Sequence, residues 1–328
     1  MLKRFTLLIV LLFTASNLRA QLRAYIVDVG QGDAIYIELP SGGNVLIDGG
    51  PSGAPIYDFL KAKGVTKIDH VVLTHPHSDH YRGLKKVFSA FDIKNFYDTR
   101  AENVDAKGDN NLRELAAAEP GCVTHFPEPG AELAWDPKVT VKVLNSCYEP
   151  VQTHDNDETN NCSLVMRLYY NGTGFLLMGD ADGLIENKMA QMFKSGLNSS
   201  ILKVSHHGSR YSSTEAFLDR VRPQYAYISV GVNNIYGHPH KEALDRLTAV
   251  GAKIFLTTSG TQSFTIPAPE KGQLFPVEPI FYGTLMTAEQ KFKDMTLTWA
   301  PDERMEAGLD SPAMTQLGEY AAQEYAAK

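Results

Sequence analysis

A cluster of histidines and one aspartate stands out in the chain: His75, His77, Asp79 and His80 lie within six residues. Imidazole and carboxylate groups are ligands that suit zinc, manganese or iron. Because side chains alternate along a strand, a strand end that carries His75 and His77 would point both rings to the same side. Asp79 and His80, beyond a turn, would then face a second ion. The cluster therefore predicts a metal centre for one ion or two.

Further ligands must come from elsewhere, and Asp180 is the best candidate. It follows the apolar run Leu176-Leu177-Met178, where a carboxylate at a strand end could bridge two cations. The alternative is that Asp180 caps the helix that follows.

Two later histidine motifs also follow apolar segments. His206 and His207 come directly after a strand predicted over 201–204, so that one could bind metal while the other contacts substrate or donates a proton. His238 could hold a phosphate oxygen or act as a general acid, and His240 is expected to cap the next helix. We take four residues as candidate substrate contacts: Ser209, Asn234, His238 and Asn161.

Strands and helices alternate along the chain, which is typical of two mixed sheets covered by helices on their outer faces. Strands are predicted over 23–29, 34–39, 45–47, 70–73, 139–144, 163–170, 173–178, 201–204, 226–230 and 253–257. Helices are predicted over 56–63, 182–195, 213–222 and 240–249, and residues 82–118 look helical and mixed. Beyond Pro267, prolines interrupt any regular element, so residues 21–268 form the predicted catalytic domain and residues 269–328 an acidic, Pro-containing extension.

Residues 1–20 resemble a signal peptide, since Lys3 and Arg4 precede an apolar run that is too short for an ordinary membrane span. We therefore expect a secreted or periplasmic protein; the alternative is an uncleaved anchor. An exported protein could pair two of its three cysteines, and Cys122 with Cys147 is the expected pair.

The charge of the chain bears on its substrate. The formal net charge is −7, and removal of residues 1–20, with three bases and no acid, would make it −10. Such a charge argues against tight, nonspecific binding of long nucleic acids. A local basic strip could still guide a strand; it would consist of Arg82, Lys85, Lys86, Lys203 and Arg210.

The motifs THPHSDH at 74–80, LIDGG at 46–50 and MGD at 178–180 resemble the metallo-β-lactamase superfamily. Within it, the chain is most similar to the hydrolase domain of the ComEC/Rec2 competence proteins. The stretches that carry this likeness are DVGQGDA at 28–34, NNCSLVMRL at 160–168, LKVSHHGS at 202–209 and ISVGVNNIYGHP at 228–239. The resemblance covers residues 22–266 and implies an α/β fold, a four-layer αββα sandwich with two divalent metal ions, Zn or Mn.

The resemblance also implies which residues bind each of the two ions. It implies that His75 and His77 bind the first ion, that Asp79 and His80 bind the second, that Asp180 bridges them and that His207 is the last ligand. Asp33 and Asp48 would orient the ligating histidines from behind. One departure concerns the first ion: many relatives have a third histidine where this chain has Asn160, Asn161 and Ser163, and His154 could replace it.

Three functions are compatible with these residues. The leading hypothesis is hydrolysis of a phosphodiester, either DNA, a nucleotide or a cell-surface phosphoester, by a metal-activated water. Asp79 or Asp180 would take the proton of that water, and His206 or His238 would protonate the leaving oxygen or hold the phosphate. The alternatives are a β-lactam, lactone or other ester hydrolase and a metal-binding envelope module without catalysis.

Overall fold

The computed structural model describes residues 21–104 and 108–270. The predicted signal peptide, and the predicted extension from residue 271 onward, lie outside the described residues. Among the residues that are described, no helix has the length and apolar character needed to cross a membrane.

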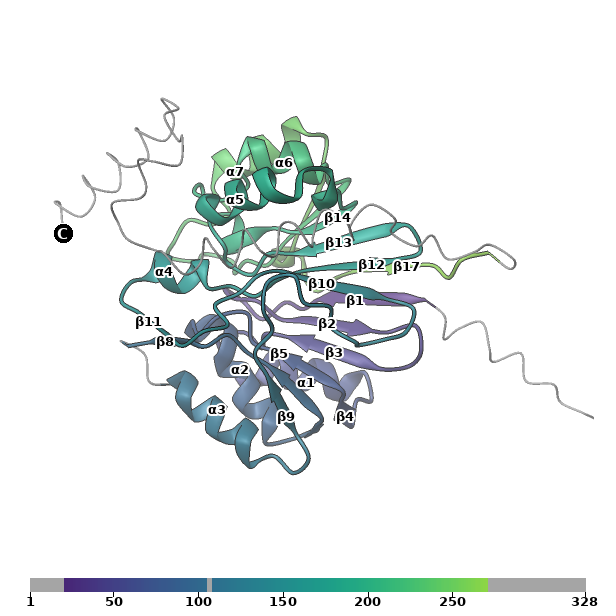
Figure 1. The fold of residues 1–328 in the computed structure, drawn as a ribbon, viewed down its shortest axis with the longest axis vertical. Helices are drawn as coiled ribbons and strands as arrows, with labels where there is room; N and C mark the ends of the chain where they lie inside the picture. Colours follow the sequence, from purple (N-terminus) through teal and green to yellow (C-terminus); the bar gives the residue numbers. More distant parts are fainter. Residues whose placement is uncertain (1–20, 105–107, 271–328) are drawn as a thin grey trace, which may run out of the picture. The chain divides into compact units, whose positions relative to one another are not determined.

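Two large sheets pack face to face at the centre of the described domain (Figure 1). The first sheet has the strand order β17 (Gln262–Ile266), β1 (Leu22–Ile26), β2 (Ile35–Glu38), β3 (Asn44–Ile47), β5 (His70–Val72), β7 (Asn95–Tyr97) and β9 (Val123–His125). The second has the order β10 (Thr140–Asn145), β12 (Val165–Tyr170), β13 (Thr173–Leu177), β14 (Ile201–Lys203), β15 (Tyr225–Ile228) and β16 (Lys253–Leu256). Two short pairs complete the strands: β11 (Val151–Thr153) with β8 (Ala101–Asn103), and β4 (Lys67–Ile68) with β6 (Asp92–Ile93).

Helices cover the outer face of each sheet, which gives the four αββα layers (Figure 1). The first sheet is covered by α1 (Gly53–Ala62), α2 (Ser78–Phe88) and α3 (Gly108–Ala118), and the second by α5 (Gly183–Phe193), α6 (Glu215–Val221) and α7 (Lys241–Ala249). The short helix α4 (Asn156–Asn161) precedes β12, and single 3₁₀ turns occupy Lys194–Leu197, Ser205–Gly208 and Thr257–Ser259.

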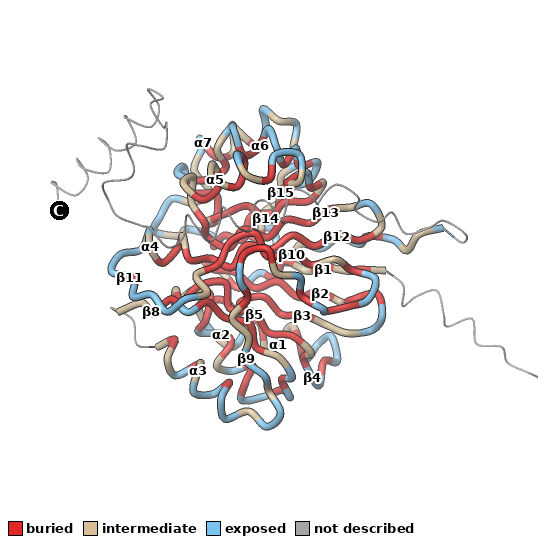
Figure 2. Tube along the Cα trace, in the orientation of Figure 1, coloured by how far each residue is buried: buried red, intermediate tan, exposed pale blue. Residues whose placement is uncertain are grey.

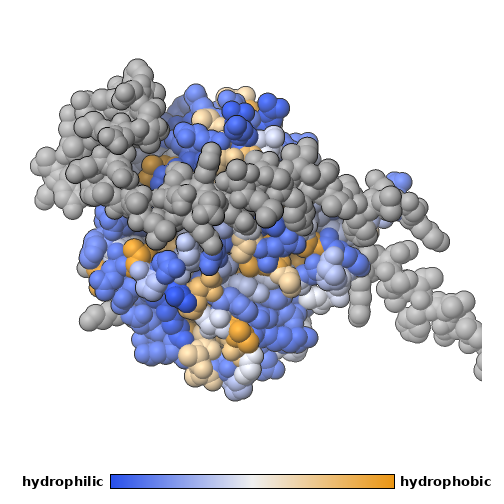
Figure 3. Space-filling view, viewed as in Figure 1, coloured by the Kyte–Doolittle hydropathy of each residue, from blue (hydrophilic) through white to orange (hydrophobic). Residues whose placement is uncertain are grey.

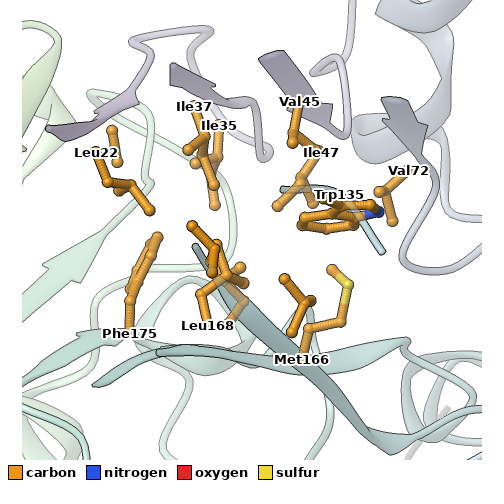
Figure 4. Packing of buried hydrophobic residues seen from close by; sticks show 14 of the residues in the cluster. Leu22, Ile35, Ile37, Val45, Ile47, Val72, Trp135, Met166, Leu168 and Phe175 are labelled. Atoms are coloured by element: carbon orange, nitrogen blue, oxygen red, sulfur yellow. The ribbon is translucent and has the colours of Figure 1, made fainter. Parts of the chain in front are cut away.

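The alternation of side chains along the strands explains both interfaces. On β3, Val45 and Ile47 point into the core between the sheets, whereas Leu46 packs under the helices. Ile56 and Leu60 of α1, spaced one turn apart, meet the helix side of this sheet. Figure 4 shows the core between the sheets, where Leu22, Ile35 and Val45 of the first sheet face Phe175, Leu168 and Met166 of the second. Complete burial of each such side chain stabilises the fold by about 1.5–3 kcal/mol.

Burial follows these layers. The buried residues are concentrated on the strands and on the inner sides of the helices, whereas exposed residues lie at helix surfaces and loop tips (Figure 2). The face in Figure 3 is mainly hydrophilic where described residues are visible, with hydrophobic residues scattered between them. The predicted fold class is therefore confirmed, and most of the predicted strands and helices are present.

Two predictions about elements were wrong in detail. Within 82–118, the chain between α2 and α3 forms the short strands β6, β7 and β8 instead of helix. The strand before the histidine cluster ends at Val72, so that His75 and His77 lie on an irregular bend and strand alternation does not orient them. Strand β17 was not predicted, and it pairs antiparallel with β1 along its whole length.

The predicted disulfide was also wrong. Cys147 is bonded to Cys162, and Cys122 is free and partly buried. The bond closes the segment that contains β11 and α4, and its Cα atoms are 4.9 Å apart. Sequence alone could not choose this partner, because the pairing depends on β10 and β12 being neighbours in the second sheet.

Candidate metal centre

The candidate ligands come together from loops that follow strands of both sheets. The bend after β5 carries His75 and His77, and the first turn of α2 carries Asp79 and His80. The N-terminal half of α2 lies against residues 48–50, so closely that a Cβ atom on Gly83 would be 1.7 Å from the carbonyl oxygen of Gly49. The amide of Gly49 donates to the carbonyl oxygen of His80 at 2.7 Å. Close backbone packing therefore fixes this end of α2.

The second sheet contributes Asp180, in the turn after β13, and His207, in the 3₁₀ turn after β14. Because β13 and β14 are parallel neighbours, their carboxyl ends bring these two residues to the same edge.

Asp180 lies at the centre of this arrangement. Its Oδ2 atom is 3.3 Å from Nε2 of His80, 3.4 Å from Nε2 of His207 and 3.9 Å from Nε2 of His75. The side chain is almost fully buried. One carboxylate oxygen is therefore within reach of imidazoles on both sides, which is the arrangement that a bridging ligand needs.

The groups on the two sides of Asp180 differ. On one side, Oδ2 of Asp79 is 3.3 Å from Nε2 of His207 and 4.0 Å from Nε2 of His80. On the other side, Nε2 of His75 is 2.9 Å from Nδ1 of His77. Asp79, His80 and His207 form one compact group that could hold a cation, and His75, His80 and Asp180 form another.

Buried carboxylates contact the distal nitrogens of two of these imidazoles. Oδ2 of Asp48 is 2.8 Å from Nδ1 of His80, and Asp48 also accepts from the amide and hydroxyl of Thr74. Nδ1 of His207 is 2.9 Å from the carbonyl oxygen of Ser229 and 3.5 Å from Oδ1 of Asp33. Acceptors face both Nδ1 atoms. In the neutral form that binds a metal, these atoms would therefore carry the proton, and the Nε2 lone pairs would point towards Asp180.

The electrostatics follow from burial and proximity. Burial opposes ionisation of Asp180, but the charges of His207 and His80 outweigh it and hold the pKa of Asp180 well below its usual value. Burial likewise opposes protonation of His80 and His207. The neighbouring carboxylates, with Asp180 making the largest contribution, outweigh burial and raise the pKa of each imidazole well above its usual value. The pKa values of His75 and His77 are lowered, chiefly by burial. Without a metal ion, protons on His80 and His207 compensate the carboxylates.

The donor atoms fit a divalent cation. Nε2 of His77, His80 and His207 and Oδ1 of Asp180 are buried and have no hydrogen bond within the described residues. A buried polar atom without a partner costs about 1–3 kcal/mol. Several such atoms from nitrogen and carboxylate ligands converge here, and a cation that accepts their lone pairs would remove that cost. Imidazole and carboxylate oxygen are ligands of zinc and of manganese.

His206 and His238 lie beside these ligands. His206 has a left-handed backbone conformation with φ 45°, and its ring centroid is 5.4 Å from that of His238. Nδ1 of each ring is buried without a hydrogen bond in the described part of the chain. Burial lowers both pKa values, that of His238 to about 3 with a contribution from His206. Both rings therefore have a free nitrogen near the candidate ligands.

The remaining candidates for substrate contact have partners inside the protein. Asn161 exchanges two hydrogen bonds with Asp182, and Oγ of Ser209 accepts from the amide of Tyr211. Asn234 bonds to the backbone of its own loop. These side chains therefore brace the loops around the site.

The predicted capping residues have other roles. Asp182, not Asp180, caps α5 through a bond from the amide of Leu184. His240 occupies the N-cap position of α7 without a capping bond, and its Nδ1 accepts from the amide of Arg210. His154, considered as a replacement for the third histidine, is on the surface.

Lys203 corrects the predicted basic strip. Its side chain is fully buried, and its Nζ lies 2.7 Å from Oδ2 of Asp33, so that it cannot guide a strand of nucleic acid. Ser163 was not identified as a site residue in its own right, although its Oγ accepts from the amide of Asp180 and lies 3.4 Å from Nδ1 of His75. The glycine before Asp180 was the only hint in the sequence of a close contact at this point. In the structure, a Cβ atom on Gly179 would be 2.8 Å from Oγ of Ser163.

Comparison with known families agrees with this site. A family model described as the metallo-beta-lactamase superfamily matches residues 27–232, a range that contains all six candidate ligands. The chain belongs to the metallo-β-lactamase superfamily. The predicted resemblance is thus confirmed, and the superfamily membership makes this chain a hydrolase-type domain with a candidate divalent metal site.

Curated relatives of this superfamily member include proteins from Bacillus subtilis and Neisseria gonorrhoeae. It is 29% identical over 266 residues to ComE operon protein 3 of Bacillus subtilis, covering 75% of this chain and 33% of that protein. It is 29% identical over 241 residues to competence protein ComA of Neisseria gonorrhoeae, covering 72% of this chain and 31% of that protein. The chain thus spans about a third of the length of these relatives. Among solved structures, the metallo-beta-lactamase fold protein YhfI from Bacillus subtilis is 12% identical with a TM-score of 0.49, over 74% of this chain and 99% of that one.

Proposed function

We propose that this chain is an exported metal-dependent phosphodiesterase that acts on nucleic acid. The observation that carries the proposal is the position of Asp180, whose Oδ2 is shared by imidazoles of two adjacent ligand groups. His75, His77 and Asp180 would hold one divalent ion, and Asp79, His80, His207 and Asp180 a second. Zinc or manganese would suit these ligands.

The chemistry of the bound ions would be to lower the pKa of a water molecule and to neutralise charge on the phosphoryl oxygens. Asp79 is better placed than Asp180 to accept the proton of the attacking water, because its side chain is 29% exposed and that of Asp180 is 3% exposed. His206 and His238, which their lowered pKa values keep neutral, would hold the phosphate by hydrogen bonds from their ring N–H groups and are poorly suited to protonate the leaving oxygen.

Nucleic acid is favoured by the relatives, one of which is named as competence protein ComA and one as recombination protein 2. The acidic chain and the burial of Lys203 argue against an extended cationic track, so we propose that one phosphodiester group and its neighbours are bound locally.

Export is supported by two observations. The first twenty residues have the pattern of a signal peptide, and the Cys147–Cys162 disulfide is of a kind that persists in oxidising compartments. We therefore propose a secreted or periplasmic location, to be tested by fractionation of cells that express the full chain and by N-terminal sequencing of the product.

The test of the activity is hydrolysis of bis(4-nitrophenyl) phosphate and of a single-stranded oligonucleotide by the metal-loaded protein, with nitrocefin as the competing substrate. We expect turnover of the two phosphodiesters with Zn²⁺ or Mn²⁺ and loss of turnover in Asp180→Asn. Turnover of nitrocefin alone would replace the proposal by a β-lactam hydrolase. Bound metal without turnover on a broad panel of esters and phosphodiesters would indicate a metal-binding module.

A further inference from the structure

The loop between β15 and α7 presents apolar side chains to solvent beside the candidate metal centre. Val232, Ile235 and Tyr236 are 69%, 91% and 59% exposed, and they are the most exposed of the large hydrophobic residues that the structure describes. Exposed apolar residues that gather in one place often mark a binding surface. Their position within five residues of one loop calls for a functional explanation.

This loop is held in a defined conformation. The side chain of Asn234 donates to the carbonyl oxygens of Gly231 and His238 and accepts from the amide of His238. At the base of the loop, the amide of Gly231 donates to Oε1 of Gln31. Since these bonds hold the backbone, Ile235 and Tyr236 are presented outward by a preorganised loop, which reduces the entropy lost when a ligand binds.

A row of rings connects the loop to the metal ligands. The ring of Tyr236 stacks on that of His238, with centroids 5.8 Å apart and planes inclined by 23°. The ring of His238 is in turn 5.4 Å from that of His206 and 6.2 Å from that of the candidate ligand His207. Tyr236 is therefore separated from a metal ligand by a single intervening ring. A group bound on Tyr236 would lie close to a phosphate bound at the metals.

We propose that Tyr236, flanked by Ile235, is a stacking platform for a nucleobase next to the phosphodiester that is cleaved, so that single-stranded nucleic acid is the substrate class. This inference rests on the proposed phosphodiesterase function and adds the recognition of the base. One face of the tyrosine packs on His238, and the residue as a whole is 59% exposed. Stacking of a base on an aromatic side chain stabilises binding and tolerates any base.

The chemistry of the loop favours a base over other apolar ligands. Residues 231–240 contain no lysine, arginine, aspartate or glutamate, so the platform attracts the uncharged part of the substrate and leaves the phosphate to the metals. A choline group is recognised by an aromatic cage, whereas Tyr236 is the only aromatic residue other than histidine in this loop. A membrane surface with anionic lipids would be repelled by a chain with a net charge of −7.

The experiment compares ligands with and without bases. Fluorescence anisotropy would measure binding of a phosphorothioate-linked oligothymidylate and of a base-free phosphorothioate oligomer of the same length to the metal-loaded protein. The variants are Tyr236→Ala, Tyr236→Phe and, as a matched control, Tyr225→Ala, since Tyr225 is an exposed tyrosine at the opposite end of β15. The same comparison would be made in turnover: kcat/KM of each variant would be measured for thymidine 5′-(4-nitrophenyl phosphate), which has a base, and for methyl 4-nitrophenyl phosphate, which has none.

We expect Tyr236→Ala to lower the preference for the base-containing ligand by about tenfold, and Tyr236→Phe and Tyr225→Ala to retain it. An unchanged preference in Tyr236→Ala, together with normal hydrolysis of methyl 4-nitrophenyl phosphate by the wild type, would overturn the platform and leave the phosphodiesterase intact. Absence of hydrolysis of either nitrophenyl ester by the wild type would overturn the proposed function itself. Loss of binding to phosphatidylcholine vesicles in Tyr236→Ala, with no change for the oligomers, would assign the loop to membranes and overturn the platform.

Discussion

At Asp180, a single carboxylate oxygen faces three imidazole nitrogens while the backbone amide is held by Ser163. The residue thus contributes charge at the point where the two ligand groups meet, and its position is set by a hydrogen bond that does not use the carboxylate. An amide in its place would preserve the shape but remove the charge that a pair of cations requires.

Asp180→Asn is therefore expected to bind metal at least about 100-fold more weakly than the wild type and to lose turnover, with its fold retained. Isothermal titration with Zn²⁺ and circular dichroism would measure the two effects. The control is Asp182→Asn, which changes the cap of α5 two residues away. Equal metal affinity in Asp180→Asn and the wild type would refute the bridging role.

Lys203 and Asp33 form a buried ion pair behind His207, with Nζ also donating to the carbonyl oxygen of Val204. The pKa of Asp33 is about 2: burial acts to raise it, but the Lys203 and His207 charges outweigh that effect. The pair therefore places a fixed negative charge next to Nδ1 of a candidate ligand.

Lys203→Met should lower the free energy of unfolding by about 3–5 kcal/mol, because it leaves the Asp33 carboxylate buried without its partner. Urea denaturation would measure this, with the exposed Lys241→Met as the control expected to change stability by less than about 0.5 kcal/mol. The double variant Lys203→Met, Asp33→Asn should recover part of the loss. Additive losses in the double variant would contradict a coupled pair.

The sequence contained enough information to propose the ligands and two of their supports, Asp33 and Asp48, which lie behind His207 and His80 as predicted, but not the remaining supports. Six ligands could be proposed because metal-binding residue types follow apolar segments. The structure brings these residues together: His75, His77, Asp79, His80, Asp180 and His207. Lys203 was assigned to the surface because a lysine is rarely buried unless it is paired, and its partner Asp33 is distant in sequence. The bonds from Ser163 and Asn161 were likewise beyond reach, since they depend on tertiary contacts.

At the scale of elements, the site is built from short loops that follow strands, and the disulfide supports one of them. The Cys147–Cys162 bond joins residues that are 15 positions apart and closes the segment with β11 and α4, and Ser163 follows directly. Alternation and apolar runs predicted most strands. The two- and three-residue strands between α2 and α3 were missed because periodicity is not measurable over so short a run.

Cys147→Ser is expected to lower the free energy of unfolding by about 3 kcal/mol, the chain-entropy value for a loop of this size. Thermal unfolding with and without a reductant would measure it, and the reductant should destabilise the wild type but not the variant. Cys122→Ser, which alters the free cysteine, serves as the control. A wild type that is insensitive to reduction would count against a stabilising disulfide.

His70, at the start of β5, gives the domain a pH-dependent element. Its ring stacks on Trp135, and burial lowers its pKa to about 4 from 6.5. Because the folded state disfavours the proton, the neutral ring stabilises the fold above about pH 6.5, and this contribution is lost as the pH falls towards 4. The free energy of unfolding of the wild type should therefore fall when the pH is lowered from about 7 to about 4.5. In His70→Leu this fall should be smaller by about 1–3 kcal/mol, as measured by urea denaturation at both pH values. Parallel losses in the two proteins would exclude His70.

For the molecule as a whole, the metal centre connects the two halves of the sandwich. His75 to His80 belong to the half built on the first sheet, whereas Asp180 and His207 belong to the second. Ions held between them would bind only the folded state and would stabilise the whole domain.

Saturation with Zn²⁺ or Mn²⁺ at about 100 times the dissociation constant should stabilise the fold by about 2.7 kcal/mol and raise Tm by about 5–10 °C. Differential scanning calorimetry with metal, and again after a chelator is added, would show the rise and its reversal. Asp180→Asn should show little of this shift. A metal-induced rise of equal size in Asp180→Asn would place the stabilising ion elsewhere.

The pairing of β17 with β1 places the two ends of the domain side by side, which affects how it can be combined with other domains. Leu22 is opposite Ile266, so both ends of the sandwich leave from the same edge of the first sheet. A domain whose ends are adjacent can be inserted into a loop of another protein, or exist apart from it, without a change in the order of its strands. This topology therefore allows the domain to occur within larger proteins, in keeping with its match to only about a third of ComE operon protein 3 and of competence protein ComA.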